Sequence, residues 1–319
     1  MLGDRKVAVA IPAYKAERSI LGVLRGLPAW IDHVVVVDDG SPDRTADLAG
    51  SLGDPRIAVI RHGKNLGVGA AMKTAYRAAL ELDADIIVKM DADGQMDPAQ
   101  LPRLLEPLLK DEADYAKGNR FFDLAALRSM PALRRSGNTV LSLLTKAASG
   151  YWDIADPTNG YTALRREALS LLNRAALHEG YFFESSMLIE LGIVRGVVCD
   201  VPIPARYADE RSSLSVLKAL WSFPPKLILG TLRRLYWRHF FFEMTPTTVF
   251  LIFGGMLSLF GLVFGAARWR ISVVTRTPQT AGTVLLAALP FLLGFHLIVE
   301  AVVLDIRDVP RRPLCRSVK

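Results

Sequence analysis

The sequence predicts an α/β fold, in which a mostly parallel sheet carries helices on both faces, followed by a membrane part. Short β-branched runs alternate with helical patterns through the first half of the chain, and that alternation is typical of parallel sheets. The composition, 51% hydrophobic and 22% charged, is too apolar for an ordinary soluble domain and too charged for a polytopic transporter. After residue 245 the chain is almost continuously apolar, which places the membrane part at its C-terminal end.

The globular part is expected to cover residues 1–213. Strands are predicted at residues 6–11, 33–38, 56–60, 85–90, 115–121, 161–165 and 197–203. Helices are predicted at residues 68–80, from Pro98 onward, and at 133–149 and 182–191. In an open sheet of this kind, ligands bind outside the carboxyl ends of the strands. Residue 12, residues 38–39 and residues 91–93 all fall at such ends.

Residues 214–244 combine arginines with large apolar side chains and are interrupted by Pro224 and Pro225. This pattern predicts broken amphipathic helices that lie in a membrane interface, although helices packed on the globular domain would look similar. In the last part, residues 245–319, Thr245 and Pro246 suit the start of a helix. Two spans follow at about 247–266 and 282–304, each of roughly 20 residues and therefore long enough to cross the hydrocarbon core.

The formal net charge is +7, and its distribution favours lipid over nucleic acid as the partner. Basic side chains concentrate on both flanks of the predicted spans, at Arg233, Arg234, Arg238, Arg307, Arg311, Arg312, Arg316 and Lys319. The loop between the spans carries fewer, so we expect a hairpin with both ends cytoplasmic. This predicts a protein of the cytoplasmic (inner) membrane with a cytoplasmic catalytic domain. In the second span, His296 and Glu300 share one helix face. Pairing of Glu300 with a flanking arginine or a neighbouring subunit is expected there, with a role in catalysis or acceptor binding as the alternative.

Two further features narrow the class of protein. Cys199 and Cys315 are the two cysteines, which gives no disulfide framework and no zinc or iron–sulfur cluster. The apolar run at the N-terminus is short and ends at Pro12, so it reads as a first core strand rather than a signal peptide.

The strongest chemical pattern is Asp91-Ala-Asp93-Gly-Gln95, which follows a buried strand. Mg²⁺ and Mn²⁺ take oxygen ligands and leave coordination positions for phosphate oxygens. Two carboxylates and an amide at a strand end therefore suit a metal–diphosphate site, whereas alone they would also suit an ordinary turn. A second acidic pair, Asp38 and Asp39, ends another strand and could bind ribose hydroxyls or shape a turn.

Six segments, IPAYKAE, VVVDDGSPD, HGKNLGVGAAMKTAY, KMDADGQMDP, KGNRF and DPTNGYTALRREAL, occur in this order. Together they resemble family 2 glycosyltransferases of the GT-A fold, specifically the branch similar to dolichol-phosphate mannose synthases and bacterial polyprenyl-phosphate glycosyltransferases. The resemblance covers about residues 5–215. It implies a Rossmann-like GT-A catalytic domain, Mn²⁺ or Mg²⁺ as the cofactor, and a nucleotide sugar and a polyprenyl phosphate as the substrates.

The resemblance also implies roles for individual residues. The metal would be held chiefly by Asp93 and Gln95, with Asp91 against the donor ribose and phosphate. Positions that line the nucleotide in the family are occupied here by Pro12, Tyr14, Glu17 and Asp39. The family's residues near the sugar phosphate and the reacting centre correspond to Arg120 and Asp156.

One loop departs from the family pattern. Many members have Gly-X-Ser-Lys where this chain has Ser213-Leu-Ser-Val, so Arg206 or Arg211 would replace the missing lysine as the partner of the diphosphate. Arg134 and Arg135 are further candidates for binding the acceptor phosphate.

The chemistry limits the roles that the site must fill. A lipid phosphate carries about −1.5 to −2 charges at pH 7, so its oxygen is already nucleophilic and a strong general base is not required. Asp156 is therefore interpreted as an orienting or electrostatic group, with proton abstraction as the other reading. Family analogy implies in-line displacement with inversion, and a UDP-hexose or UDP-N-acetylhexosamine is favoured as donor, with GDP-mannose open.

The sequence also bears on three other functions. A processive polysaccharide synthase would need a Gln-X-X-Arg-Trp motif and more spans. A catalytically dead nucleotide-binding scaffold is disfavoured by the intact acidic residues. A dinucleotide enzyme is disfavoured because Gly67-Val-Gly69 lacks the third glycine. Oligomerisation through the spans is a further expectation.

Overall fold

The computed structural model describes residues 4–122, 132–204 and 216–316 of the chain. Its backbone contacts divide it into two compact units: residues 1–234 with 310–319, and residues 235–309. The predicted boundaries after residues 213 and 244 are functional divisions that this partition does not test, and they stay predictions.

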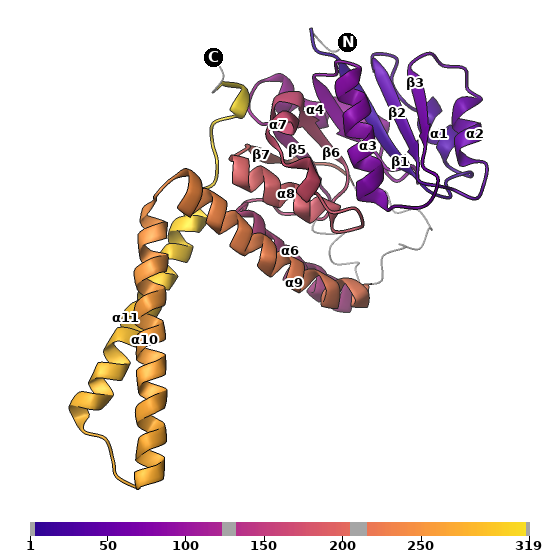
Figure 1. Cartoon of the computed structure of the whole chain (residues 1–319). Coiled ribbons are helices and arrows are strands. Elements are labelled where there is room, and N and C mark those ends of the chain that lie inside the picture. The colour runs from indigo at the N-terminus through magenta and orange to yellow at the C-terminus, as the bar shows by residue number, and fades with distance from the viewer. Residues whose placement is uncertain (1–3, 123–131, 205–215, 317–319) are drawn as a thin grey trace. The chain divides into compact units, whose positions relative to one another are not determined.

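The first unit is built on a seven-stranded sheet with the order β3-β2-β1-β4-β6-β5-β7 (Figure 1). The strands are β1 (Val7–Ala13), β2 (His33–Asp38), β3 (Ile57–Arg61), β4 (Ile86–Lys89), β5 (Tyr115–Asn119), β6 (Thr162–Arg165) and β7 (Val198–Pro202). All neighbours pair in parallel except at β6, which runs antiparallel to both β4 and β5. The predicted, mostly parallel α/β sheet is therefore confirmed.

Helices cover both faces of this sheet. Those of the first unit are α1 (Ile20–Arg25), α2 (Thr45–Gly50), α3 (Val68–Glu81), α4 (Leu101–Leu109), α6 (Ala132–Ser149), α7 (Arg166–Leu171), α8 (Phe183–Val194) and α9 (Val216–Leu235). Alternate residues of β1, such as Val9 and Ile11, pack with α1 and α4 in one core cluster. The opposite face is covered by α3, which lies across β1 and β2, and Phe183 of α8 packs against Tyr76 of α3.

Helix α9 differs from the prediction of broken helices. It continues through Pro224 and Pro225, although proline removes a backbone hydrogen bond from a helix interior. The reason lies in packing, because Phe223 and Leu227 are buried. The ring of Phe223 meets that of Phe182 edge-on, with 5.1 Å between the ring centroids. These contacts hold the helix on the first unit on both sides of the proline pair.

The basic flank before the hairpin is also partly different from the expectation. Arg234 is 1% exposed, and it donates hydrogen bonds to the carbonyl oxygens of Ala147 and Ala148 at 3.1 and 3.0 Å. These oxygens belong to the last turn of α6, where helical carbonyls lack a partner within the helix. Arg234 therefore serves a helix end and not a lipid headgroup. Arg307, Arg311 and Arg312 are exposed, as expected.

The second unit is a helical hairpin of α10 (Pro246–Thr275) and α11 (Ala281–Arg307). Both helices are long and apolar enough to cross a membrane, and few of their side chains are buried, unlike core helices of a soluble domain. Helix α10 begins at the predicted cap, where Thr245 and Thr248 form a capping box. It extends nine residues beyond the predicted end at 266, so Arg268 and Arg270 lie in the helix and not in the loop.

Small residues bring the two helices of the hairpin together. A side chain on Gly294 would overlap the backbone nitrogen of Ser258, and one on Gly261 would overlap Phe291. Close approach through small residues is how helices pack in lipid, where burial of apolar surface gives no driving force. At the open end of the hairpin, Arg238 pairs with Asp308, so this arginine too is internal.

After the hairpin, the chain returns to the first unit. Asp114, just before β5, is fully buried and accepts hydrogen bonds from the backbone N–H of Val197 at 2.7 Å and of Leu314 at 2.9 Å. Burial raises the pKa of the Asp114 carboxyl. The C-terminal tail is thus attached to the sheet at the amino ends of β5 and β7.

Candidate active site

A cleft of about 660 Å³ opens at the carboxyl ends of the strands, as expected for a sheet of this type. Several predicted site residues line it, namely Pro12, Tyr14, Glu17, Asp39, Asp91, Asp93, Gln95 and Arg120. Arg206 and Arg211 lie outside the described residues, as do the side chains of Arg134 and Arg135. All residues that line the cleft belong to the first unit.

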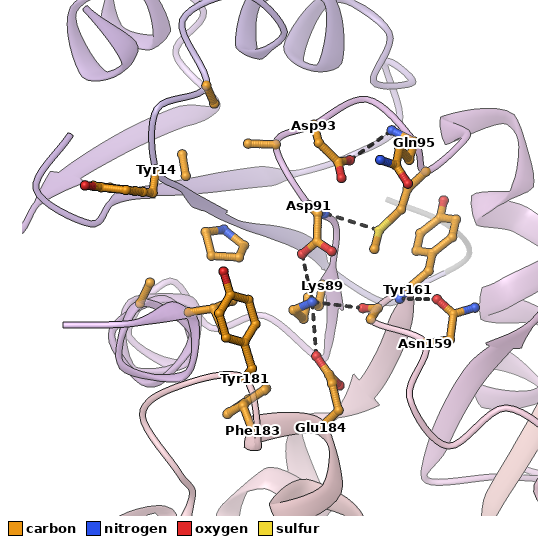
Figure 2. Close-up of a pocket in the computed structure, with 18 of the residues that line it drawn as sticks. Tyr14, Lys89, Asp91, Asp93, Gln95, Asn159, Tyr161, Tyr181, Phe183 and Glu184 are labelled. Carbon is orange, nitrogen blue, oxygen red and sulfur yellow. Dashed lines mark hydrogen bonds and ion pairs between the residues drawn. The ribbon is translucent and has the colours of Figure 1, made fainter. Parts of the chain in front are cut away.

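The acidic segment after β4 turns sharply inside the cleft. Gly94 has a φ of +79°, a left-handed conformation that glycine adopts without steric strain. The turn is closed by Asp93, whose carboxylate accepts a hydrogen bond from the backbone N–H of Gln95 at 2.9 Å. Asp91, Asp93 and Gln95 therefore lie close together on one wall (Figure 2).

This donor set fits a divalent ion held with few protein ligands. Among the described residues, no group of three or more His, Cys, Asp or Glu side chains could hold a metal. Mg²⁺ is commonly bound through one or two carboxylates together with substrate phosphates and water. Two carboxylates and one amide oxygen facing an open cleft satisfy that requirement.

The segments after β1 and β2 form the other wall. The side chain of Tyr14 is 45% exposed and projects into open space beside the cleft (Figure 2), where a ring could stack on a base. Asp39 is instead nearly buried and accepts hydrogen bonds from the ring of His62 at 2.8 Å and from the backbone N–H of Gly67 at 2.7 Å. Asp39 therefore fixes the loop that leads into α3, in addition to lining the cleft.

A buried charge network on the cleft floor was not predicted from the sequence (Figure 2). Lys89, the last residue of β4, is 3% exposed. Its Nζ lies 2.8 Å from Asp91 and 3.1 Å from Glu184, and it donates to the carbonyl oxygen of Gly160 at 3.3 Å. Burial by itself lowers the pKa of Lys89, but the two carboxylates outweigh it and raise the pKa above its usual value.

A second lysine completes the network. Lys117 of β5 is fully buried, and its Nζ lies 3.9 Å from Glu184 and donates to the carbonyl oxygen of Asn159. Burial lowers the pKa of Lys117, although Glu184 opposes this effect. A sequence signal did exist at Lys89, because this lysine interrupts the apolar run of residues 86–90 and a buried lysine must find an anionic partner.

Arg120 and Asp156 form the remaining part of the site. Arg120 follows β5, and its Nε and Nη2 donate to the two carboxylate oxygens of Asp156 at 2.8 and 3.2 Å. The Asp156 side chain is fully buried, whereas that of Arg120 is 39% exposed and lines the cleft. Thr158 donates a further hydrogen bond to Asp156 at 3.2 Å. The sequence placed both residues near one centre, and the structure brings them into a bidentate ion pair.

Comparison with known proteins agrees with this architecture. The model of the family described as "Glycosyl transferase family 2" matches residues 8–172. A UDP-N-acetylglucosamine–dolichyl-phosphate N-acetylglucosaminyltransferase of Methanococcus voltae is 30% identical over 65% of this chain and 88% of its own length. An undecaprenyl-phosphate mannosyltransferase of Micrococcus luteus is 34% identical over 62% of this chain and 82% of its own length.

Solved structures show the same fold. A glucosyl-3-phosphoglycerate synthase from Mycobacterium tuberculosis, solved with UDP, has a TM-score of 0.55 and 23% identity over 72% of this chain and 80% of its own. A mannosyl-3-phosphoglycerate synthase from Rubrobacter xylanophilus has a TM-score of 0.57 and 20% identity over 76% of this chain and 77% of its own. At these identities the likeness concerns the fold alone, and it confirms the predicted GT-A class. Since the family model matches more than half of the chain, the protein belongs to glycosyl transferase family 2.

Proposed function

We propose that this chain transfers a sugar from a nucleotide-sugar donor to the phosphate of a polyprenyl phosphate at the surface of a membrane. The observation that carries the proposal is the cleft itself, which holds two carboxylates after β4 and the guanidinium of Arg120. Carboxylates suit a metal-bound diphosphate, and arginine binds phosphate through bidentate hydrogen bonds. Relatives named for dolichyl or undecaprenyl phosphate support the acceptor.

The donor would occupy the walls described above. Pro12, Tyr14 and Glu17 offer an aromatic ring and a carboxylate to the base, and Asp39 shapes the loop beside them. The proposed donor is a UDP-hexose or a UDP-N-acetylhexosamine, with GDP-mannose as the alternative. Mn²⁺ or Mg²⁺, held by Asp91, Asp93 and Gln95, would neutralise the diphosphate when bound.

The reaction that fits these residues is a displacement at the anomeric carbon. An oxygen of the acceptor phosphate forms the new bond to that carbon. The bond to the donor diphosphate breaks, and the nucleoside diphosphate leaves with the electron pair. Attack opposite the leaving group inverts the configuration. Because the acceptor phosphate is already anionic, the site has to supply position and charge neutralisation rather than a base.

The roles of Arg120 and Asp156 follow from their contacts. Both oxygens of Asp156 accept hydrogen bonds from Arg120, and Thr158 also donates to one of them. A carboxylate so engaged is better suited to orient the guanidinium than to accept a proton from a substrate. Arg120, which is more exposed, would contact phosphate in the cleft. Arg206 or Arg211 stays a predicted second contact to the diphosphate.

Two features of the chain support a membrane location. The hairpin of α10 and α11 has the length and composition of two spans. Helix α9 exposes large apolar side chains, among them Trp221, which is 83% exposed, and Leu229, which is 68% exposed; such a face suits the headgroup region. We propose a cytoplasmic-membrane protein with its catalytic unit in the cytoplasm. Oligomerisation of the chain through the hairpin stays a prediction.

The experiment uses the full chain purified in detergent. It is incubated with polyprenyl phosphate, Mn²⁺ or Mg²⁺ and a panel of labelled nucleotide sugars, and label that enters the organic phase is counted. We expect transfer from one donor, abolished by chelator and by Asp93→Asn. Asp47→Asn is the matched control, since Asp47 is an exposed acid in α2 that pairs with Arg61, and it should keep full activity.

The opposite result is equally clear. If no donor labels lipid while UDP or GDP still binds in a metal-dependent way, the acceptor assignment is wrong, and a nucleotide-binding scaffold becomes the better description.

A further inference from the structure

A carboxylate that neither the motifs nor the proposed mechanism uses lies next to the Arg120–Asp156 pair. Asp200 lies on β7, which pairs in parallel with β5 so that Asp200 is opposite Lys117. Its Oδ2 accepts a hydrogen bond from the backbone N–H of Ala155 at 2.6 Å and another from the Asn119 side chain at 3.2 Å. Ala155 directly precedes Asp156 in the chain.

These contacts form two adjacent cross-links between the same two segments. Asn119 ends β5 and Arg120 follows it, whereas Ala155 and Asp156 lie in the loop before β6. Asp200 bridges Asn119 and Ala155. The ion pair joins the next residue of each segment, Arg120 and Asp156. A bond to the backbone N–H of Ala155 restricts the direction in which the next side chain, that of Asp156, can point.

The surroundings of Asp200 are unusual for a purely structural side chain. Its Oδ1 is buried and makes no hydrogen bond within the described part of the chain, an arrangement that is rare and costly in proteins. Burial raises the pKa of Asp200 to about 6, and the nearby charges of Asp156 and Asp153 add to the rise. The hydrogen bond from the backbone N–H of Ala155 and, more weakly, the charge of Lys117 oppose it. A turn that needed only a hydrogen-bond acceptor could have used an uncharged side chain.

We propose that Asp200 is a positioning residue for transfer: by holding the N–H of Ala155, it sets the orientation of Asp156 and, through Asp156, that of the Arg120 guanidinium. The proposal rests on the proposed function, in which Arg120 contacts phosphate at the reacting centre. Small displacements of such groups lower the rate without abolishing donor binding, which separates this role from that of the nucleotide-binding residues.

The test compares four variants of the full chain in detergent. Asp200→Ala removes the acceptor, and Asp200→Leu removes it while filling a similar volume, which covers the case in which the alanine variant does not fold. Asp200→Asn keeps an oxygen that can accept from Ala155. Asp153→Asn is the control, because Asp153 is an exposed carboxylate in the same loop. The readouts are kcat, the donor KM and hydrogen exchange of the Ala155 amide.

We expect Asp200→Ala and Asp200→Leu to lower kcat by about 10- to 100-fold with the donor KM unchanged, and to speed exchange at Ala155. Asp200→Asn should restore kcat to within a few-fold of the unaltered protein, and Asp153→Asn should change none of the three readouts. If kcat stays unchanged in the alanine and leucine variants while the unaltered protein transfers sugar, the proposal is overturned and the proposed function stands.

The exchange measurement decides the case in which the unaltered protein transfers no sugar. If hydrogen exchange at Ala155 is then unchanged in the alanine and leucine variants, the claim that Asp200 holds this N–H is overturned as well. Faster exchange would support that contact, while the proposed function alone fails.

Discussion

Replacing Lys89 by methionine probes the charge network on the floor of the cleft. Methionine keeps most of the length of the side chain and fills irregular space, so the change removes the charge with little loss of packing. Lys89 is 3% exposed and reaches Asp91 at 2.8 Å and Glu184 at 3.1 Å. In the variant, both carboxylates lose their nearest cation.

The magnitude follows from the exposure of the two acids. Removing one member of a buried ion pair destabilises a protein by about 3–5 kcal/mol. The Asp91 side chain is 34% exposed, so water can replace Lys89 there, whereas that of Glu184 is 14% exposed. Lys117, at 3.9 Å from Glu184, compensates in part. We therefore expect the lower end, about 3 kcal/mol, which corresponds to a fall in Tm of about 6–12 °C for a unit of this size.

Thermal unfolding of the full chain in detergent, followed by tryptophan fluorescence, measures this shift. The matched control is Lys110→Met, because Lys110 pairs with Glu106 at 2.6 Å on the surface of α4, with both side chains more than half exposed. Exposed pairs of this kind contribute little, so no measurable shift is expected. The double variant Lys89→Met/Glu184→Gln should be more stable than Lys89→Met, since the acid is then no longer left unpaired. Equal Tm values for Lys89→Met and the control would refute the reasoning.

Four further variants test other parts of the structure. Gly69→Ala should lower the free energy of unfolding in urea by about 1–3 kcal/mol, because the new Cβ would overlap the backbone of His178 and Glu179. Asp114→Ala should lower Tm by several degrees and leave transfer intact, since it releases the C-terminal tail from the sheet. Gly294→Val should reduce protease resistance of the hairpin, whereas Gly255→Val, which meets open space, should not. In the unaltered protein, the pKa of the Asp200 carboxyl rises from 3.8 to about 6 on folding. The free energy of unfolding therefore falls by up to about 3 kcal/mol as the pH rises through that window, and Asp200→Asn removes this loss. The variant should therefore gain stability over the unaltered protein between pH 4 and 7.

The order of the elements and one wall of the site could be predicted from sequence because both rest on local pattern. Buried strands such as β2 are continuous β-branched runs, and α3 carries its apolar stripe at helical spacing. Asp91, Asp93 and Gln95 lie within five residues of the chain. Their side chains therefore come together in the cleft because the strand before them ends there.

The rest of the site depends on pairings between distant segments, and these leave little local signal. Glu184 meets Lys89 across 95 positions of sequence, and Asp200 meets Ala155 across 45. Arginines before the hairpin are a similar case. From composition, Arg234 reads as a lipid contact, but it binds the final carbonyls of α6. A local pattern cannot distinguish these two uses of a positive charge, because both place arginine beside apolar residues.

The C-terminal tail is attached to the sheet at a distance from the cleft. The tail bonds to Asp114, which precedes β5, and the same carboxylate holds the N–H of Val197, which precedes β7. These are the amino ends of the two strands, whereas Arg120 and Asp200 lie at or near their carboxyl ends. The tail is therefore attached at the end of the sheet opposite to the cleft. Its release in Asp114→Ala should leave the residues at the carboxyl ends of β5 and β7 in place, which is the reason that this variant is expected to lose stability and to keep transfer.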